Sequence, residues 1–183
     1  WLFADVDFTL SKNNFTETNC INFIFANIQG LITENNNSKI KYLETLLNEE
    51  EFAFAIITES HLHKCKDGCD RCIEDSEVKI TNYDIIRTDR TDRTKGGCCI
   101  FLKEKFKKEI LISRSNDCVE VLAIKIENPN VILVAIYRPP NSKTEKFEDM
   151  IKEIRNTLKD ISKPMPNILI CGDFNFPFLE WKN

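Results

Sequence analysis

Short runs of Ile, Val, Leu and Phe recur along the chain, each five to eight residues long, with polar turns between them. Apolar runs of this length predict buried β-strands, because a buried helix needs about ten residues or more. The chain must therefore fold around sheets, and helices can only cover them. The predicted strands cover residues 20–27, 52–58, 83–87, 98–103, 119–126, 131–137 and 167–171.

Two segments show a helical period instead. Ser38 can cap a helix whose apolar side chains fall on one face, and residues 143–160 form the clearer amphipathic helix, ended by Pro164. Residues 1–19 are polar and show no period, so we expect a poorly defined leader. Residues 20–183 contain no repeat and no internal boundary, which predicts a single α+β domain.

Bulk composition narrows the class of protein. With 42% hydrophobic and 30% charged residues, the chain can fill one core. Its net charge of −4 argues mildly against nucleic acid as a partner, because Lys and Arg supply most of that affinity, although a basic patch can lie on an acidic body. No apolar run could span a bilayer and no secretory signal is visible, so we expect no membrane and an intracellular location, nucleus or cytoplasm. Cysteines inside apolar runs also fit a reducing compartment.

Polar residues recur where the predicted strands end. Asn27, Glu59 and Tyr137 follow or close three strands, and Asp173 and Asn175 follow the last one. Two carboxylates and two amides offer the hard oxygen ligands that Mg²⁺ prefers. Each residue could equally cap a turn or a loop, so the order of the set carries more weight than any single member.

That order resembles the endonuclease/exonuclease/phosphatase superfamily. Asn27-Ile-Gln-Gly-Leu, Thr58-Glu59-Ser-His-Leu, Tyr137-Arg-Pro-Pro and Gly172-Asp173-Phe-Asn175-Phe-Pro follow the order and spacing of its motifs. The last two forms look most like the apurinic-type endonuclease of non-LTR retrotransposons. The resemblance covers about residues 20–183 and implies a four-layer α/β-β/α sandwich of two mixed sheets.

The resemblance also implies a role for each residue. Glu59 matches the principal metal ligand, and Asn27 matches an Asn near the metal and the phosphate. Tyr137 matches a Tyr that contacts the scissile phosphate or the leaving group. Asp173 matches the residue that orients or deprotonates the attacking water, and Asn175 matches an Asn that holds the phosphate in the transition state. The implied cofactor is Mg²⁺, with Mn²⁺ as an alternative.

One family feature has no counterpart in the chain. The family closes its site with a Ser-Asp-His-type motif after the Gly-Asp-Phe-Asn strand, whereas the two histidines here, His61 and His63, lie far ahead of it. We therefore expect the front two-thirds of the domain, with its second half incomplete and no activity by itself. The implied partners are DNA and a downstream reverse transcriptase domain.

Two alternatives stay open. The chain could be a decayed or truncated retroelement domain without activity. It could also be another phosphodiesterase or phosphatase of the same fold, which the Tyr-Arg-Pro-Pro form disfavours.

Two further clusters deserve a prediction of their own. Cys65, Cys69 and Cys72 lie near the two histidines and could in principle hold zinc, but zinc sites usually split their ligands into two separated pairs. A solvent-facing loop or one disulfide is the preferred interpretation.

The basic residues at and after the end of the strand at 83–87 could contact a DNA backbone, or could lie in a solvated loop where Asp84, Asp89 and Asp92 cancel their charge. These basic residues are Arg87, Arg90, Arg93 and Lys95.

Overall fold

The protein consists of two β-sheets packed face to face. The computed structural model describes residues 2–9, 20–32, 38–63, 73–90, 95–140, 142–159 and 166–175. In spatial order, the first sheet holds β1 (Leu2–Thr9), β2 (Cys20–Asn27), β3 (Phe54–Thr58), β5 (Cys98–Lys103) and β4 (Tyr83–Thr88). The second sheet holds β6 (Lys108–Ser115), β7 (Glu120–Ile126), β8 (Val131–Tyr137) and β9 (Asn167–Asp173).

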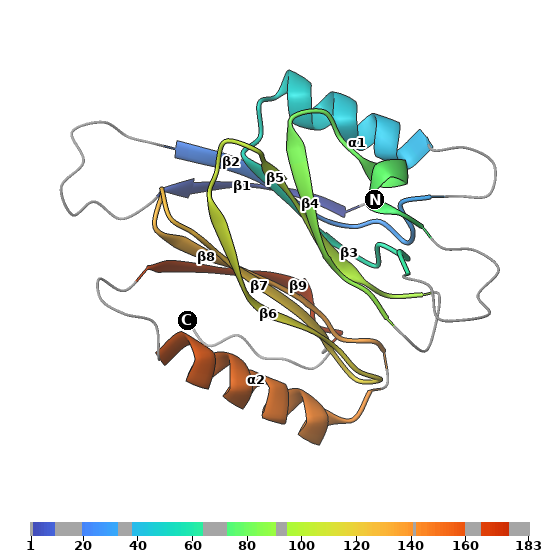
Figure 1. Cartoon of the computed structure of the whole chain (residues 1–183). Coiled ribbons are helices and arrows are strands. Elements are labelled where there is room, and N and C mark those ends of the chain that lie inside the picture. Colours follow the sequence, from blue (N-terminus) through green and yellow to red (C-terminus); the bar gives the residue numbers. More distant parts are fainter. Residues whose placement is uncertain are drawn as a thin grey trace.

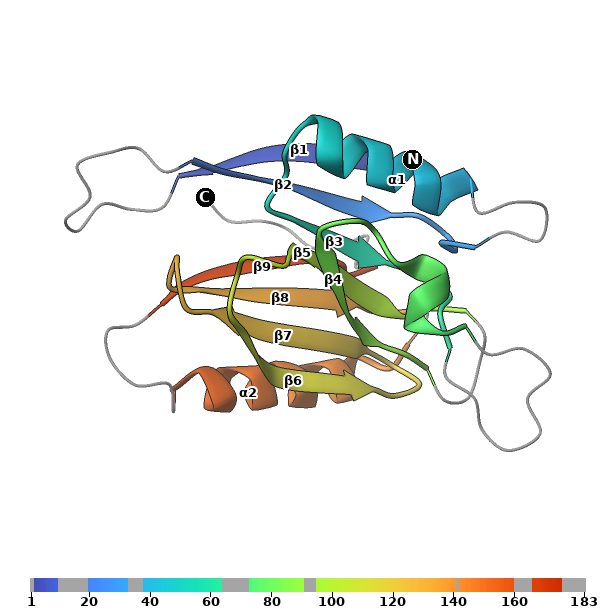
Figure 2. The same cartoon turned by 45° about the horizontal axis from the view of Figure 1, so that its top comes forward.

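Each sheet carries a helix on its outer face. Helix α1 (Ser38–Glu49) covers the first sheet, and helix α2 (Thr144–Lys159) covers the second, so that the order of layers is helix, sheet, sheet, helix (Figures 1 and 2). This confirms the predicted four-layer arrangement. Neither helix, nor any other in the described part of the chain, is long and apolar enough to cross a membrane.

Three apolar clusters fill the spaces between the four layers. Along β7, Leu122 and Ile124 face the first sheet, whereas Val121 and Ala123 face α2. Both faces of the strand are therefore buried, which explains why its sequence is almost continuously apolar. The predicted faces of the helices are confirmed by the same clusters, through buried Ile40, Leu43 and Leu47 of α1 and Met150 and Ile154 of α2.

The cysteines of the apolar runs behave as small hydrophobic residues. Cys98, Cys99 and Cys118 are buried as free thiols, and Cys171 is half-buried. Burial raises the pKa of Cys171 to about 11, so this thiol is protonated at neutral pH and is a poor nucleophile.

Two strands lie outside the predictions. Residues 2–9 were expected to form a leader without regular structure, yet β1 pairs antiparallel with β2 over its whole length. Strand β6 runs along the edge of the second sheet, is mostly exposed and carries an irregularity between Ile110 and Ile112. An exposed edge strand needs no apolar run, and a bulge interrupts its alternation, so neither signal was present in the sequence.

Both sheets contain one parallel pair, and the two pairs set the position of the candidate site. Strands β2 and β3 run parallel with Asn27 opposite Thr58, and β8 and β9 run parallel with Tyr137 opposite Asp173. The carboxyl ends of each pair lie side by side. The polar residues that follow these strands therefore gather at one end of the sandwich.

Candidate active site

The side chain of Asn27 joins the two sheets at this end. Its Nδ2 atom donates to Glu59 Oε1 at 2.9 Å and to Asp173 Oδ2 at 2.9 Å. An ionised carboxylate can only accept hydrogen bonds, so the nitrogen of the amide must face both carboxylates. Among the described residues, Asn27 Oδ1 is buried and has no hydrogen-bond partner. Three of the predicted site residues are thus brought into direct contact, with one amide oxygen available for a ligand.

The backbone around Glu59 is held in an uncommon conformation. Glu59 and His61 have φ values of 52° and 53°, in the left-handed region that non-glycine residues seldom adopt. Hydrogen bonds secure this segment, with Gly30 N donating to Glu59 O at 2.7 Å and Leu31 N donating to Ser60 O at 2.9 Å. Strained conformations of this kind persist only where the surrounding structure enforces them, and they are common at functional sites.

His61 lies beside Glu59, although its position in the chain did not suggest a role in the site. Its Nε2 atom is 3.6 Å from Glu59 Oε2. Burial lowers the pKa of His61, against the opposing charge of Glu59, so the imidazole is neutral at pH 7. Contact with the residue two positions earlier depends on the left-handed backbone, for which the sequence held no signal.

Tyr137 comes from the second sheet and is 6% exposed. Burial raises its pKa strongly, and the negative charge of Glu59 and a hydrogen bond to it add to the effect. The phenol therefore remains protonated well above neutral pH and can act as a hydrogen-bond donor.

Asp173 ends β9, and its side chain closes a turn with Asn175, two residues later. Asn175 N donates to Asp173 Oδ1 at 3.2 Å, and Asn175 Nδ2 donates to Arg138 O at 2.8 Å. The guanidinium of Arg138 returns a bond to Asn175 O at 2.9 Å. Arg138 belonged to a recognised motif without an assigned role, and the structure shows that it holds the turn that carries Asn175. Gly172 precedes the turn, where a Cβ atom would run into the carbonyl oxygen of Ile136.

A cleft of about 440 Å³ opens beside these residues. Asn27 and Asp173 line it together with Lys39, whose Nζ donates to Ile28 O at 2.7 Å. The cleft therefore offers a carboxylate, an amide and a cationic group. Its other lining residues are Phe25, Ile28, Gln29 and Gly172.

Comparison with known proteins gives a fold but no close relative. No protein-family model and no curated protein matches the chain. Solved structures do match. A Bacteroides thetaiotaomicron endonuclease/exonuclease/phosphatase family protein aligns with a TM-score of 0.53 at 15% identity, over 85% of this chain and 62% of its own. The chain has the endonuclease/exonuclease/phosphatase fold.

Other structures with this fold carry different activities in their names. The endonuclease domain of TRAS1, a telomere-specific non-LTR retrotransposon, aligns with a TM-score of 0.53 at 14% identity, over 84% of this chain and 58% of its own. A mannosyl-6-phosphatase from Bacteroides thetaiotaomicron aligns with a TM-score of 0.54 at 17% identity, over 85% and 65%. The chain spans between 47% and 65% of the length of eight solved structures with this fold. At these identities the likeness establishes the fold and leaves the reaction open.

The donor set in the endonuclease/exonuclease/phosphatase site suits a hard divalent cation. Glu59 and Asn27 Oδ1 are oxygen donors, and Mg²⁺ is commonly held by only one or two carboxylates while it keeps several waters. Within the ranges that the structure describes, no group of three or more His, Cys, Asp and Glu side chains is arranged to hold a metal. A sparse site of this kind fits Mg²⁺ better than zinc, which takes four closely packed ligands.

Two of the four basic residues considered for DNA contact, Arg87 in β4 and Arg90 after it, have buried side chains. The side chain of Arg87 is 4% exposed and pairs with Asp89 at 2.8 Å, and that of Arg90 is 3% exposed and pairs with Glu120 at 3.4 Å. Buried and paired guanidinium groups of this kind are not presented to a DNA backbone, which is a correction to the role considered for them. Lys95 is exposed. Arg93, like the proposed zinc ligands Cys65, Cys69 and Cys72, lies outside the described residues.

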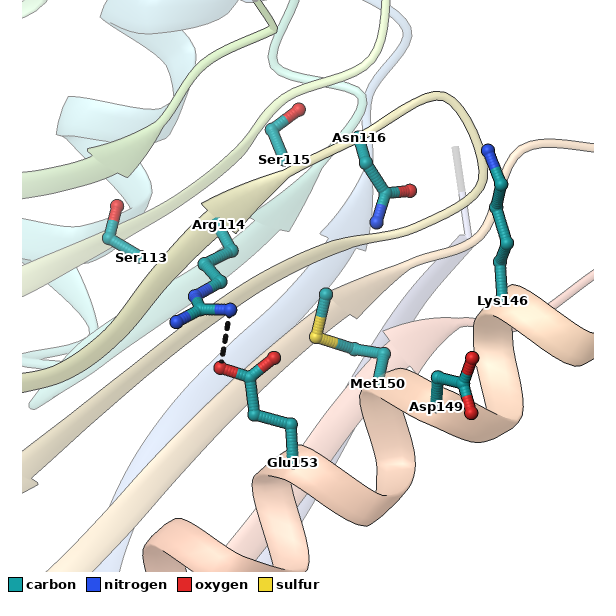
Figure 3. A pocket seen from close by; sticks show the side chains of 8 residues that line it. All are labelled: Ser113, Arg114, Ser115, Asn116, Lys146, Asp149, Met150 and Glu153. Carbon is teal, nitrogen blue, oxygen red and sulfur yellow. Dashed lines mark ion pairs between the residues drawn. The ribbon is translucent and has the colours of Figure 1, made fainter.

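A second cleft, of about 580 Å³, lies between β6 and α2, on the outer side of the second sheet (Figure 3). Its charged groups are engaged in ion pairs, since Arg114 contacts Glu153 across the cleft at 2.7 Å and Lys146 contacts Asp117 outside the lining at 2.8 Å. No residue of the predicted site lines it. We therefore place the candidate active site at the Asn27 cleft and not at this larger one. The cleft between β6 and α2 is lined by Ser113, Arg114, Ser115, Asn116, Lys146, Asp149, Met150 and Glu153.

Proposed function

We propose that the chain is part of a metal-dependent phosphodiesterase that nicks DNA, the endonuclease of a non-LTR retrotransposon. The observation that carries this proposal is the Asn27 amide, which donates to both Glu59 and Asp173 and so unites a prospective metal ligand with a prospective base. The motif forms around Tyr137 and Asp173, together with the fold shared with the TRAS1 endonuclease domain, favour DNA as the substrate.

Glu59 and Asn27 would hold the cation, Mg²⁺ or in its place Mn²⁺. When bound, the cation would neutralise charge on the phosphate and on its leaving oxygen. Glu59 suits this task because Gly30 N donates to its carbonyl oxygen, and the carbonyls on either side of it, at Thr58 and Ser60, accept from Ile28 N and Leu31 N. Asn27 suits it because its nitrogen is committed to carboxylates, which leaves its buried oxygen as the donor atom.

The remaining residues would act on the water and on the phosphate. Asp173 would accept a proton from the attacking water, the usual task of a carboxylate at such a site. Tyr137 stays protonated because of its raised pKa, so its hydroxyl, which donates to Glu59 in this structure, would turn to donate a hydrogen bond to a phosphate oxygen instead. Asn175 would bring a second neutral donor, which stabilises developing negative charge without adding a carboxylate that would repel the substrate.

An acidic chain needs local positive charge to bind DNA. Two lysines provide it here, since Lys39 lines the cleft and both Lys39 and Lys95 are near enough to lower the pKa of His61. Arg87 and Arg90 form buried ion pairs that stabilise the fold, and they do not add to this positive charge. We further propose that DNA is the partner of this face and that a reverse transcriptase domain belongs to the same polyprotein.

A nicking assay on supercoiled plasmid tests the proposal. Because the chain spans about 60% of comparable structures, the assay should use the longest reading frame that contains it, with the 183-residue chain beside it. We expect nicking that needs Mg²⁺ or Mn²⁺, that stops with EDTA, and that Asp173→Ala and Glu59→Gln abolish. Hydrolysis of phosphomonoesters without nicking would instead favour a phosphatase. An inert full-length protein that binds no cation would favour a decayed element.

A further inference from the structure

A buried ion pair connects the two sheets close to the site without being part of the reaction chemistry proposed above. The side chains of Arg90 and Glu120 are 3% and 0% exposed, and Arg90 Nη1 lies 3.4 Å from Glu120 Oε1. Glu120 stands opposite Tyr137 in the second sheet, and its Oε2 atom accepts a hydrogen bond from Gly97 N, just ahead of β5 in the first sheet. Arg90 is also anchored, because it donates to Asn116 O at 3.3 Å.

The Gly96-Gly97 segment connects Glu120 to the residues after Glu59 through backbone hydrogen bonds. Gly97 O accepts from Ser60 N at 3.1 Å, and Gly96 O accepts from His61 N at 2.7 Å. Both glycines have φ values near 90–100°, which only glycine adopts freely. A Cβ atom at Gly96 would lie 2.5 Å from Glu120 Oε1, so the close approach of the carboxylate also requires glycine.

A core at this place does not need charge for its stability. A buried pair loses hydration on both partners, and apolar side chains of similar size often serve a core equally well. The pair does give one thing that an apolar contact lacks, a directed bond from the second sheet to the backbone of the first. Through Gly97, that bond fixes the position of the segment that carries Glu59. Its other end is fixed beside the site too, because Glu120 stands opposite Tyr137 on the neighbouring strand.

We propose that Glu120, oriented by Arg90, positions the segment of residues 59–61 on the first sheet against Tyr137 and Asp173 on the second. Glu120 is a positioning residue: it acts through Gly97 and touches neither substrate nor cation. The inference rests on the proposed function where it concerns cation binding, and on the hydrogen bonds alone where it concerns the backbone.

The test replaces the pair by apolar side chains of similar size in the longest reading frame that contains the chain. Arg90→Met with Glu120→Leu removes both charges at once, so that neither is left buried without a partner. The matched control is Arg87→Met with Asp89→Leu, which removes the other buried pair that begins on β4 and leaves the Gly96-Gly97 contacts untouched. Two measurements are made on each protein: the dissociation constant for Mn²⁺ by electron paramagnetic resonance, and hydrogen exchange of the Ser60 and His61 amides.

We expect the Arg90/Glu120 double variant to bind Mn²⁺ about 10–100-fold more weakly, as is found when groups behind a metal ligand are lost. Its Ser60 and His61 amides should exchange about tenfold faster, whereas the control should match the wild type in both measurements. Glu120→Gln keeps an oxygen for Gly97 N, so it should retain most of the protection, and it serves as the test if the double variant does not fold.

Unchanged Mn²⁺ affinity and unchanged amide exchange in the Arg90/Glu120 variant would overturn the inference, and so would equal losses in the control. A wild-type protein that binds no Mn²⁺ would contradict the proposed function instead. In that case faster exchange of the two amides in the Arg90/Glu120 variant alone would still support the positioning role.

Discussion

Changing Asn27 to Asp puts a third carboxylate between the two that the amide now joins. The amide donates to Glu59 and Asp173 at 2.9 Å each, and the substitution removes both donations while it adds a negative charge at the same place. The volume of the side chain hardly changes. The effect is therefore almost purely electrostatic, which makes its size and its dependence on pH predictable.

The magnitude follows from the contacts that are replaced. Each hydrogen bond to a charged group contributes about 1.5–3 kcal/mol, and two unit charges 4 Å apart repel by about 4 kcal/mol at an effective dielectric constant of about 20. The site is partly open to solvent, so the full repulsion is not reached. The protein can also bind a proton at the new carboxyl, which limits the loss to about 1.4 kcal/mol for each pH unit above its unfolded pKa.

The sign of the pH dependence is fixed by the same contacts. Neighbouring carboxylates raise the pKa of the new carboxyl in the folded state above its unfolded value of about 3.9. A raised folded pKa means that stability is complete at low pH and falls as the pH rises through it. Between about pH 5 and pH 7.5, Asn27→Asp should therefore lose up to about 3.5 kcal/mol more than the wild type.

Urea unfolding at these two pH values, without divalent cations, measures this difference. Asn27→Leu is the control, because it loses the same two hydrogen bonds without adding a charge and should change much less with pH. Millimolar Mn²⁺ should restore stability to Asn27→Asp more than to Asn27→Leu. If the two variants lose equal stability at both pH values, Asn27 does not lie between ionised carboxylates and the description of the site is wrong.

Two other substitutions separate binding from structure. Lys95→Ala should weaken binding to duplex DNA of any sequence and lower the slope of affinity against salt by about 1, while stability changes by less than about 0.5 kcal/mol. Arg87→Met should do the reverse, with a loss of about 3 kcal/mol in urea unfolding because the buried carboxylate of Asp89 loses its ion pair with Arg87, and no change in the salt slope. An equal effect of both on DNA affinity would contradict the inward orientation of Arg87. Tyr137→Phe should slow nicking by about 100-fold. In an absorbance titration it should also remove a tyrosine that ionises above pH 10, the range in which its raised pKa makes the folded state lose stability; a titration identical to that of the wild type would refute the assignment.

Most of the fold could be read from the sequence because its interior strands are buried on both faces. Strand 20–27 was predicted with the bounds that β2 has, since apolar side chains are needed towards α1 and towards the second sheet alike. Strands β1 and β6 were not predicted, because an edge strand is defined more by its pairing partner than by an apolar run. Pairing between segments leaves no local pattern in the sequence.

The same difference decides which site residues were found. Asn27, Tyr137 and Asp173 each end a strand with a run of apolar residues, so a local pattern located them, and the order of motifs implied their roles. His61 and Glu120 were missed because their places depend on backbone conformation and on packing between the sheets. Arg90 was misjudged for a related reason: a charged residue in a polar stretch is expected in solvent, and only the tertiary structure shows the carboxylate that allows its burial.

The hydrogen bond between Asn27 and Asp173 spans 146 residues of sequence. Glu59 leaves the ribosome 114 residues before Asp173 (173 minus 59), which at ordinary rates of translation is an interval of roughly 6–23 seconds. Once β5 has been made, the first sheet can hold Asn27 and Glu59 together, but the carboxylate from β9 does not yet exist. The hydrogen bond from Asn27 to Asp173 can therefore form only after β9 has been made. The same bond can report on the docking of the two sheets, since it requires β9 of the second sheet to lie against β2 of the first.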